Sequence, residues 1–299
     1  MKFNNMTSLL VKSVAALAVS TSMGFAGVSG KAPVPPPPAP APAALFDTIG
    51  ANLSVGYDTR YYNRGIWLTD DAIWADLNVT VPLTEQLDFY FGAKYLDNFN
   101  SAPGNVLPGT YDFSQLDLYT GINYDLGFGT FGVNFTQYMY PNSFGGTTAG
   151  ATTAGAFADE FGITSASELG LTFATSFYGF NWDLGWYYNF RIGGSYYETN
   201  LSYEIPVTPW MSLVPAFQAG FSNDYFSAVS TNVGIGLGAR SSGWSHFAFS
   251  LSAPIALTPT TTLKPYISWI STATTTNYLA GNASANNEIF GGVSLSVSF

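Results

Sequence analysis

Ser245 and His246 are adjacent in the sequence, and together they have the clearest potential for covalent chemistry. A serine nucleophile that is activated by a histidine base, itself oriented by a third group, can hydrolyse esters. His246 is the only histidine of the chain. Because neighbouring residues of a β-strand point to opposite faces, we expect the two side chains not to pair. The sequence therefore predicts a structural role for His246.

Charged residues alternate with apolar ones over most of the chain, although only 9% of residues are charged. If the apolar positions of a membrane-spanning sheet face lipid, their neighbours face a central lumen. This parity predicts twelve charged pore-lining residues: Asp58, Arg60, Asp76, Asp88, Lys94, Asp117, Glu168, Asp183, Arg191, Glu198, Glu204 and Lys264. Such charges either brace a narrow barrel from wall to wall or line a hydrated pore, and both interpretations stay open.

Neutral polar residues are predicted on the same face, and they extend the range of solutes that the lumen could bind to uncharged ones. They are Asn52, Asn78, Gln115, Tyr119, Asn123, Asn134 and Asn181. Their amides and hydroxyls suit sugars or nucleosides, although generic lining of the lumen is the better interpretation. No metal or cofactor site is predicted, because the glycine-rich segments lack a following helix and the acidic pairs lie in loops.

The elements that must position these residues are strands, because the pattern of hydrophobicity repeats every two residues from residue 49 onward. Strands of about ten residues with one apolar and one polar face are typical of a transmembrane β-barrel. Twelve are predicted: 49–61, 72–82, 86–97, 111–124, 128–140, 166–177, 180–191, 194–205, 211–222, 244–256, 261–271 and 288–299. The segment 223–243 also alternates in part. An even strand number favours an external loop there.

Aromatic residues and prolines support an all-β, antiparallel, up-and-down barrel. Pro82, Pro206 and Pro254 each close a strand, which predicts one common rim. Aromatic girdles at the membrane interfaces are predicted for Tyr57, Tyr61, Trp67, Tyr95, Tyr138, Trp186, Trp210 and Trp269. The last strand alternates up to Phe299, and it resembles the signal by which outer-membrane barrels are recognised by their assembly machinery.

The N-terminal residues predict export. Residues 1–26 have two lysines, a short apolar stretch and a small-residue site ending at Ala26, as in a signal peptide. Residues 27–48 form a proline-rich periplasmic linker, and 49–299 the barrel. Loss of Lys2 and Lys12 would leave seven basic residues against 19 acidic ones, a net charge of −12. This acidity argues against nucleic acid as a partner.

The segment Tyr57–Asp71, Y-D-T-R-Y-Y-N-R-G-I-W-L-T-D-D, resembles the family of outer-membrane porins sometimes labelled TorF. Arg64 and Gly65 match the R-G pair of that family's first turn, and Tyr61 matches its tyrosine. Arg60 and Asn63 depart from the pattern, since the family tends to have Asp and an aromatic residue there. The resemblance implies a diffusion channel without naming a solute.

The sequence predicts a porin-like channel of the bacterial outer membrane for small polar solutes or ions, with weak cation preference. Its partners would be the lipid bilayer and the barrel assembly machinery, and an oligomer is compatible with the pattern. A non-conducting structural barrel or loop-display scaffold is the main alternative. An outer-membrane lipid hydrolase is disfavoured, because Ala248 stands where the phospholipase pattern H-x-S-N-G requires serine.

Overall fold

A computed structural model describes residues 49–99, 114–141, 165–191, 193–225, 242–272 and 287–299. The expected signal peptide and linker lie outside these residues, and so does most of 223–243. No helix within the described ranges is long and apolar enough to cross a membrane.

Within these described residues, fourteen strands form one antiparallel sheet. They are β1 (Gly50–Asn63), β2 (Ile66–Pro82), β3 (Leu87–Asn98), β4 (Ser114–Asp125), β5 (Thr130–Met139), β6 (Ser165–Phe177), β7 (Phe180–Asn189), β8 (Gly194–Tyr203), β9 (Ile205–Thr208), β10 (Met211–Asn223), β11 (Gly243–Ser252), β12 (Ile255–Thr258), β13 (Thr261–Thr272) and β14 (Asn287–Ser298).

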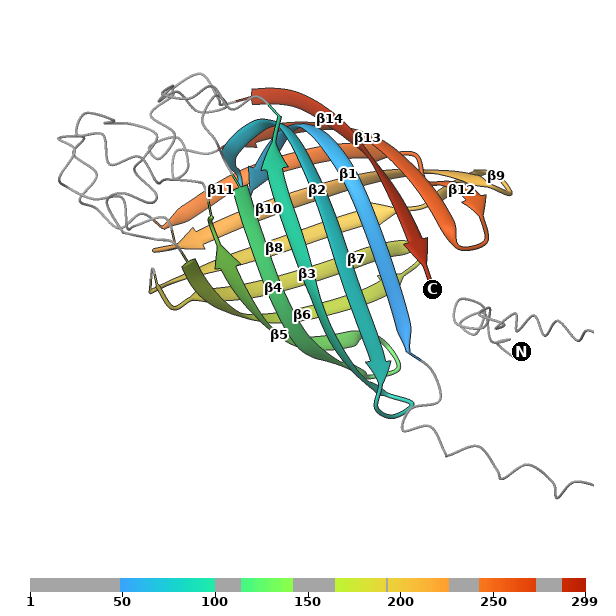
Figure 1. The fold of residues 1–299 in the computed structure, drawn as a ribbon, viewed down its shortest axis with the longest axis horizontal. Coiled ribbons are helices and arrows are strands. Elements are labelled where there is room, and N and C mark those ends of the chain that lie inside the picture. The colour runs from blue at the N-terminus through green and yellow to red at the C-terminus, as the bar shows by residue number, and fades with distance from the viewer. Residues whose placement is uncertain (1–48, 100–113, 142–164, 192, 226–241, 273–286) are drawn as a thin grey trace, which may run out of the picture.

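The sheet closes on itself as a barrel (Figure 1), because β14 pairs with β1. The short strands β9 and β12 continue β8 and β11 after a break and pair with β10 and β13. The wall therefore has twelve strands, as the sequence predicted. Closure satisfies the backbone hydrogen bonds of every strand, which is required wherever the sheet meets hydrocarbon.

The outer face of the wall is apolar. Leu53 lies opposite Leu77 on one side and Val297 on the other, so apolar positions of neighbouring strands coincide. Leu53 and Leu77 are exposed, as are Phe91, Leu118, Ile122, Phe135, Leu251, Ile267 and Val293 along the same face of other strands. This continuous apolar band fits the hydrocarbon core of a bilayer.

The two ends of the barrel differ in their connections. At one end, here called the turn end, the links are 83–86, 126–129, 178–179, 204–210 and 253–260. At the opposite end, the loop end, lie the β1–β2 and β7–β8 turns and the last described residues of β3, β5, β10 and β13. Pro82, Pro206 and Pro254 all lie at the turn end, in agreement with the common rim that was predicted.

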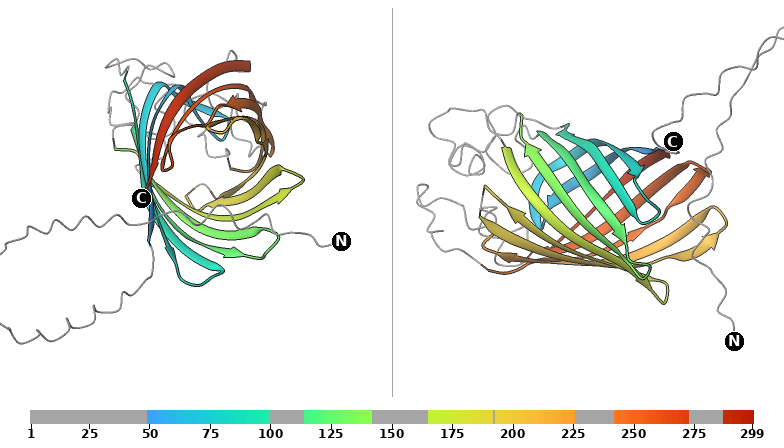
Figure 2. Two further views of the ribbon diagram at one scale, coloured as in Figure 1. Left: turned by 90° about the vertical axis from the view of Figure 1, so that its right-hand side faces the viewer. Right: turned by 90° about the horizontal axis from the view of Figure 1, so that it is seen from below.

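The strands β1 and β2 are longer than the sequence pattern indicated. They run on to Asn63 and from Ile66, joined by Arg64 and Gly65, whose φ angles are +54° and +84°. Two residues with positive φ form the tight turn that suits the twist of a hairpin. A bulge between Tyr61 and Tyr62 interrupts the register just before this turn. The end of the hairpin curves inward at the loop end (Figures 1 and 2).

Candidate luminal site

The tip of the β1–β2 hairpin, residues 62–67, crosses the lumen and contacts the opposite wall through Arg64. Both terminal nitrogens of the Arg64 guanidinium donate hydrogen bonds to the carboxylate of Glu168 on β6. The Tyr225 hydroxyl donates to the same carboxylate at 2.7 Å, and that of Tyr138 at 3.2 Å. Glu168 is only 1% exposed. A carboxylate buried this deeply requires such partners, because an unpaired buried charge is strongly destabilising.

Three tyrosine rings surround the same guanidinium. The Arg64 Cζ atom lies 4.7 Å from the ring centroid of Tyr187, 4.9 Å from Tyr196 and 4.8 Å from Tyr225. These distances are within the range of cation–π attraction. We refer to Glu168, Tyr187, Tyr196 and Tyr225 as the arginine cage. Glu168, Tyr187 and Tyr196 lie on wall strands, and Tyr225 follows β10 by two residues. The hairpin supplies only Arg64 to this cluster.

Gly65 fits against His246 of β11. A Cβ atom at position 65 would lie 2.7 Å from His246 Nδ1 and 2.8 Å from its Cβ, closer than any side chain tolerates. Glycine is therefore required here both for its positive φ and for the close approach of the hairpin to the wall.

The expectation that Ser245 and His246 do not pair is wrong. A bulge after Gly220 shifts the register, because Gly220 faces His246 whereas Phe221 faces Trp244, so Ser245 is the extra residue of β11 at this point. The extra residue allows both side chains to lie inside the barrel. Ser245 Oγ lies 3.0 Å from His246 Nδ1, and Gln218 Oε1 lies 3.3 Å from His246 Nε2.

This Ser–His pair has poor geometry for hydrolysis. Ser245 and His246 are 0% and 1% exposed, so a lipid ester in the membrane cannot reach them. The group at the second ring nitrogen is the Gln218 amide, which cannot stabilise an imidazolium as a carboxylate does. The pair instead supports the hairpin tip.

Apolar contacts hold the opposite face of the hairpin against the wall. Tyr61 and Leu68 of the hairpin pack on a small core of Ala72 and Leu96 inside the barrel. The amine of Lys94 lies 5.3 Å from the ring centroid of Tyr61. The sequence placed Tyr61 and Tyr138 in the aromatic girdles. In the structure both take part in the luminal clusters, because the hairpin fills this part of the lumen.

A luminal cavity of about 360 Å³ adjoins the hairpin tip. Its lining combines Asn63, Arg64 and Gly65 of the tip with polar wall residues, among them Glu198, Gln218, His246 and Ser268. The Tyr196 hydroxyl donates to Glu198 at 3.3 Å. Guanidinium, carboxylate, amide and imidazole groups thus face one small space, which can bind a polar molecule through hydrogen bonds and charge.

Several predicted luminal charges lie in this loop-end half and are paired. Arg60 forms ion pairs with Asp70 at 3.3 Å and Glu288 at 2.8 Å. Asp58 accepts hydrogen bonds from Tyr266 at 2.7 Å and Trp74 at 3.0 Å. Asp76 accepts a hydrogen bond from Tyr119 at 2.7 Å, and Asp117 accepts one from Gln115 at 2.8 Å. Lys94 lies opposite both of these acidic residues in the sheet register.

The turn-end half is more open. Asp183 accepts a hydrogen bond from Asn200 at 3.2 Å and Glu204 accepts one from Ser212 at 2.6 Å, and both acidic residues are exposed. Lys264 is also exposed, and Asp88 is half-buried. Arg191 lies beyond β7, exposed in the β7–β8 turn, so it is not part of the strand wall.

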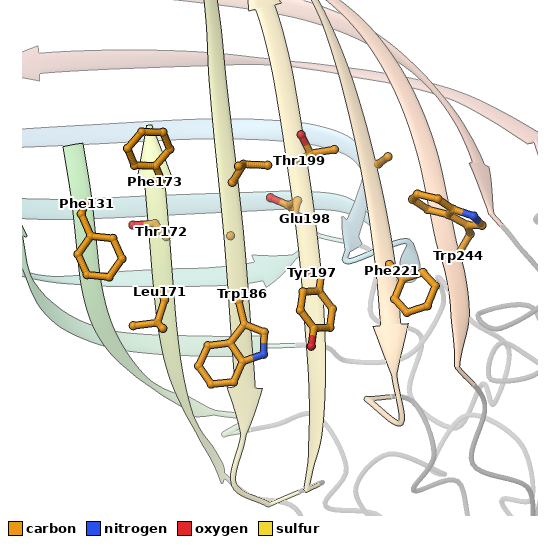
Figure 3. Close-up of a pocket in the computed structure, with 13 residues that line it drawn as sticks. Phe131, Leu171, Thr172, Phe173, Trp186, Tyr197, Glu198, Thr199, Phe221 and Trp244 are labelled. Carbon is orange, nitrogen blue, oxygen red and sulfur yellow. The ribbon is translucent and has the colours of Figure 1, made fainter. Parts of the chain in front are cut away.

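A second depression of about 440 Å³ lies on the outside of the wall over β5 to β11 (Figure 3). Phe131, Leu171, Trp186, Tyr197 and Trp244 line it, and Trp244 is 52% exposed. These positions belong to the apolar face that meets lipid, so this depression offers no polar chemistry comparable to the lumen. Among the described residues, no cluster of side chains is suited to hold a metal ion.

Sequence reasoning identified Glu168 and Glu198 but missed the cage that surrounds Arg64. Arg64 was noted only for its match to a turn motif, and Tyr187, Tyr196 and Tyr225 were not selected. The R-G turn between two alternating segments is a hairpin signal. It could have revealed the turn, although not its insertion into the lumen.

No protein-family model and no curated protein matches this chain. Among solved structures, it is similar to an outer membrane channel from Pseudomonas putida F1, with a TM-score of 0.52, 11% identity and coverage of 86% of this chain and 97% of the other. The KdgM porin has a TM-score of 0.45, 7% identity and coverage of 83% and 99%. LpxR from Salmonella typhimurium has a TM-score of 0.42, 8% identity and coverage of 83% and 99%.

These likenesses concern the fold. The likeness to the Pseudomonas putida channel, together with the closed twelve-stranded wall and its apolar exterior, shows that the chain has the fold of an outer-membrane β-barrel. The narrower resemblance to the TorF-like porins has no support from a family model, and it stays a prediction.

Proposed function

We propose that the protein is an outer-membrane channel for small polar solutes or ions, and that the β1–β2 hairpin tip is its constriction. The observation that carries the proposal is the contrast between the two halves of the lumen. At the turn end the charged residues Asp183, Glu204 and Lys264 are exposed, whereas at the loop end a polar hairpin tip occupies the interior.

Charge in the open half favours cations. Asp88, Asp183 and Glu204 lie there with a single base, Lys264, among the described strand and rim residues. Acidic side chains in a narrow, hydrated passage raise the local concentration of cations. The expected preference is weak, because the tip brings the opposite charge of Arg64 to the narrowest part.

Conductance in a planar lipid bilayer tests the proposal. The purified protein should produce discrete current steps, with a reversal potential in a KCl gradient that indicates modest cation preference. The variant Asp88→Asn/Asp183→Asn/Glu204→Gln should move this potential toward zero without loss of conductance. Glu85→Gln is the matched control, because Glu85 is an exposed acid in the β2–β3 turn.

A non-conducting structural barrel is the second candidate. It is favoured by the dense contacts of the tip with Glu168 and the tyrosines, which could brace the wall permanently. Absence of current steps, together with liposomes that do not swell in solutions of small sugars, would establish this alternative and overturn the channel.

We also propose that the barrel assembly machinery recognises the last strand. Phe299 closes the seam of the barrel, with its backbone N–H donating to the Ala51 carbonyl at 2.8 Å.

A further inference from the structure

The arginine cage is built almost entirely by the barrel wall. Glu168 comes from β6, Tyr187 from β7 and Tyr196 from β8, and Tyr225 follows β10. The hairpin contributes only the cation that fills it. The cage therefore resembles a binding site that the wall forms by itself, and Arg64, held on a two-residue turn, occupies it as a ligand would.

The composition of the cage suits one chemical class. The two oxygens of Glu168 each accept a hydrogen bond from a different terminal nitrogen of Arg64, which is the bidentate arrangement specific to a planar guanidinium. Three aromatic faces at 4.7–4.9 Å complete the enclosure. Guanidinium is weakly hydrated and stacks on aromatic rings, whereas sodium and potassium ions keep their water and cannot make the forked contact.

We infer that the cage is a binding site for guanidinium-type organic cations and that Arg64 is its resident occupant. This inference rests on the proposed function and gives it a substrate class. A permeating solute that carries a guanidinium group competes with Arg64 for Glu168 and the tyrosines. Successful competition releases the hairpin tip from the wall and widens the passage.

The adjoining cavity makes this exchange feasible in space. It contacts Arg64 directly and is lined by Glu198 and Gln218, which can bind the remainder of a small cationic solute. Because Arg64 is tethered beside the cage by a tight turn, its effective concentration there is at least the millimolar value of a short flexible linker. A free competitor must therefore be supplied at millimolar concentration or above.

Removal of the resident arginine provides the direct test. Arg64→Ala leaves the cage empty, and millimolar guanidinium chloride should refill it. We expect guanidinium to raise the melting temperature of this variant in detergent and to lower its bilayer conductance in a saturable manner. Urea, a neutral molecule of the same shape, and sodium chloride at equal ionic strength should do neither.

The double variant Arg64→Ala/Glu168→Gln is the matched control, since it keeps the tyrosines but removes the carboxylate. The midpoint of the guanidinium effect should rise at least about tenfold there, as expected for loss of a charged bidentate contact. If guanidinium acts on Arg64→Ala no more strongly than urea or sodium, or acts equally on the double variant, the inference is overturned.

A second measurement avoids dependence on the folding of Arg64→Ala. The chain has no cysteine, so Asn63→Cys gives a single thiol beside Arg64 in an otherwise unchanged protein. Guanidinium should accelerate the reaction of this thiol with a maleimide, and urea should not. Equal rates with both would contradict the inference.

The two proposals fail separately. If neither the natural protein nor Arg64→Ala conducts, the proposed channel function fails, whereas the melting temperature and the thiol reaction still decide whether the cage binds guanidinium.

Discussion

Gly65→Ala tests whether the hairpin tip is held in the lumen by close packing against His246. Alanine in the left-handed region costs about 1–2 kcal/mol. The added Cβ would also lie 2.7 Å from His246 Nδ1 and 2.9 Å from its Cγ, and overpacking of this kind typically costs about 1–3 kcal/mol more. Gly127 is the matched control, because its φ of +82° is nearly the same and nothing lies within 4 Å of its Cβ position.

The two costs act on different equilibria. The backbone cost is present whether the tip is inside the lumen or lifted out of it, since the two-residue turn persists in both states. The clash with His246 exists only while the tip is inside. An overpacking cost of about 2 kcal/mol would therefore raise the population of the lifted tip about thirtyfold. Gly127→Ala should leave that population unchanged.

The reaction rate of a thiol measures this population. In the Asn63→Cys background, Gly65→Ala should increase the rate of maleimide labelling by about one order of magnitude or more. It should also increase bilayer conductance. Replacement of His246 by glycine removes all three contacting atoms, Nδ1, Cβ and Cγ, so Gly65→Ala should have little effect in a His246→Gly background. Equal labelling rates for Gly65→Ala and Gly127→Ala, or no relief from His246→Gly, would refute the packing argument.

The remaining predictions concern the wall, the seam and the Ser–His pair. Leu77→Arg places a charge on the lipid face, where Leu77 is 46% exposed, and should destabilise the barrel by about 2–4 kcal/mol in denaturant titrations in lipid vesicles. The neighbouring Asn78→Arg points into the lumen and should cost much less. Deletion of Phe299 removes two backbone hydrogen bonds to Ala51 at the barrel seam and should lower the folded fraction recovered from outer membranes. The purified protein and its Ser245→Ala variant should both release no fatty acid from phospholipid vesicles, since Ser245 is 0% exposed.

The amino-acid pattern determined the barrel wall. Each of the twelve predicted strands has a counterpart in the sheet, because lipid and water select alternate side chains along every strand and this selection is local. The same parity predicted Asp58, Asp76 and Glu168 as pore-lining residues from the local sequence. It failed at Ser245 and His246, since a bulge adds one residue and parity reasoning assumes that none is added.

The tertiary structure alone decided that the first hairpin enters the lumen. Arg64 forms hydrogen bonds with Glu168, 104 residues away in the sequence, and with Tyr225, 161 residues away. Nothing in the residues near Arg64 specifies these partners. The tyrosines of the cage read locally as ordinary strand or girdle aromatics. Only closure of the sheet brings β6, β7 and β8 opposite β1, so the site exists because the barrel closes around a turn that is short enough to fold into it.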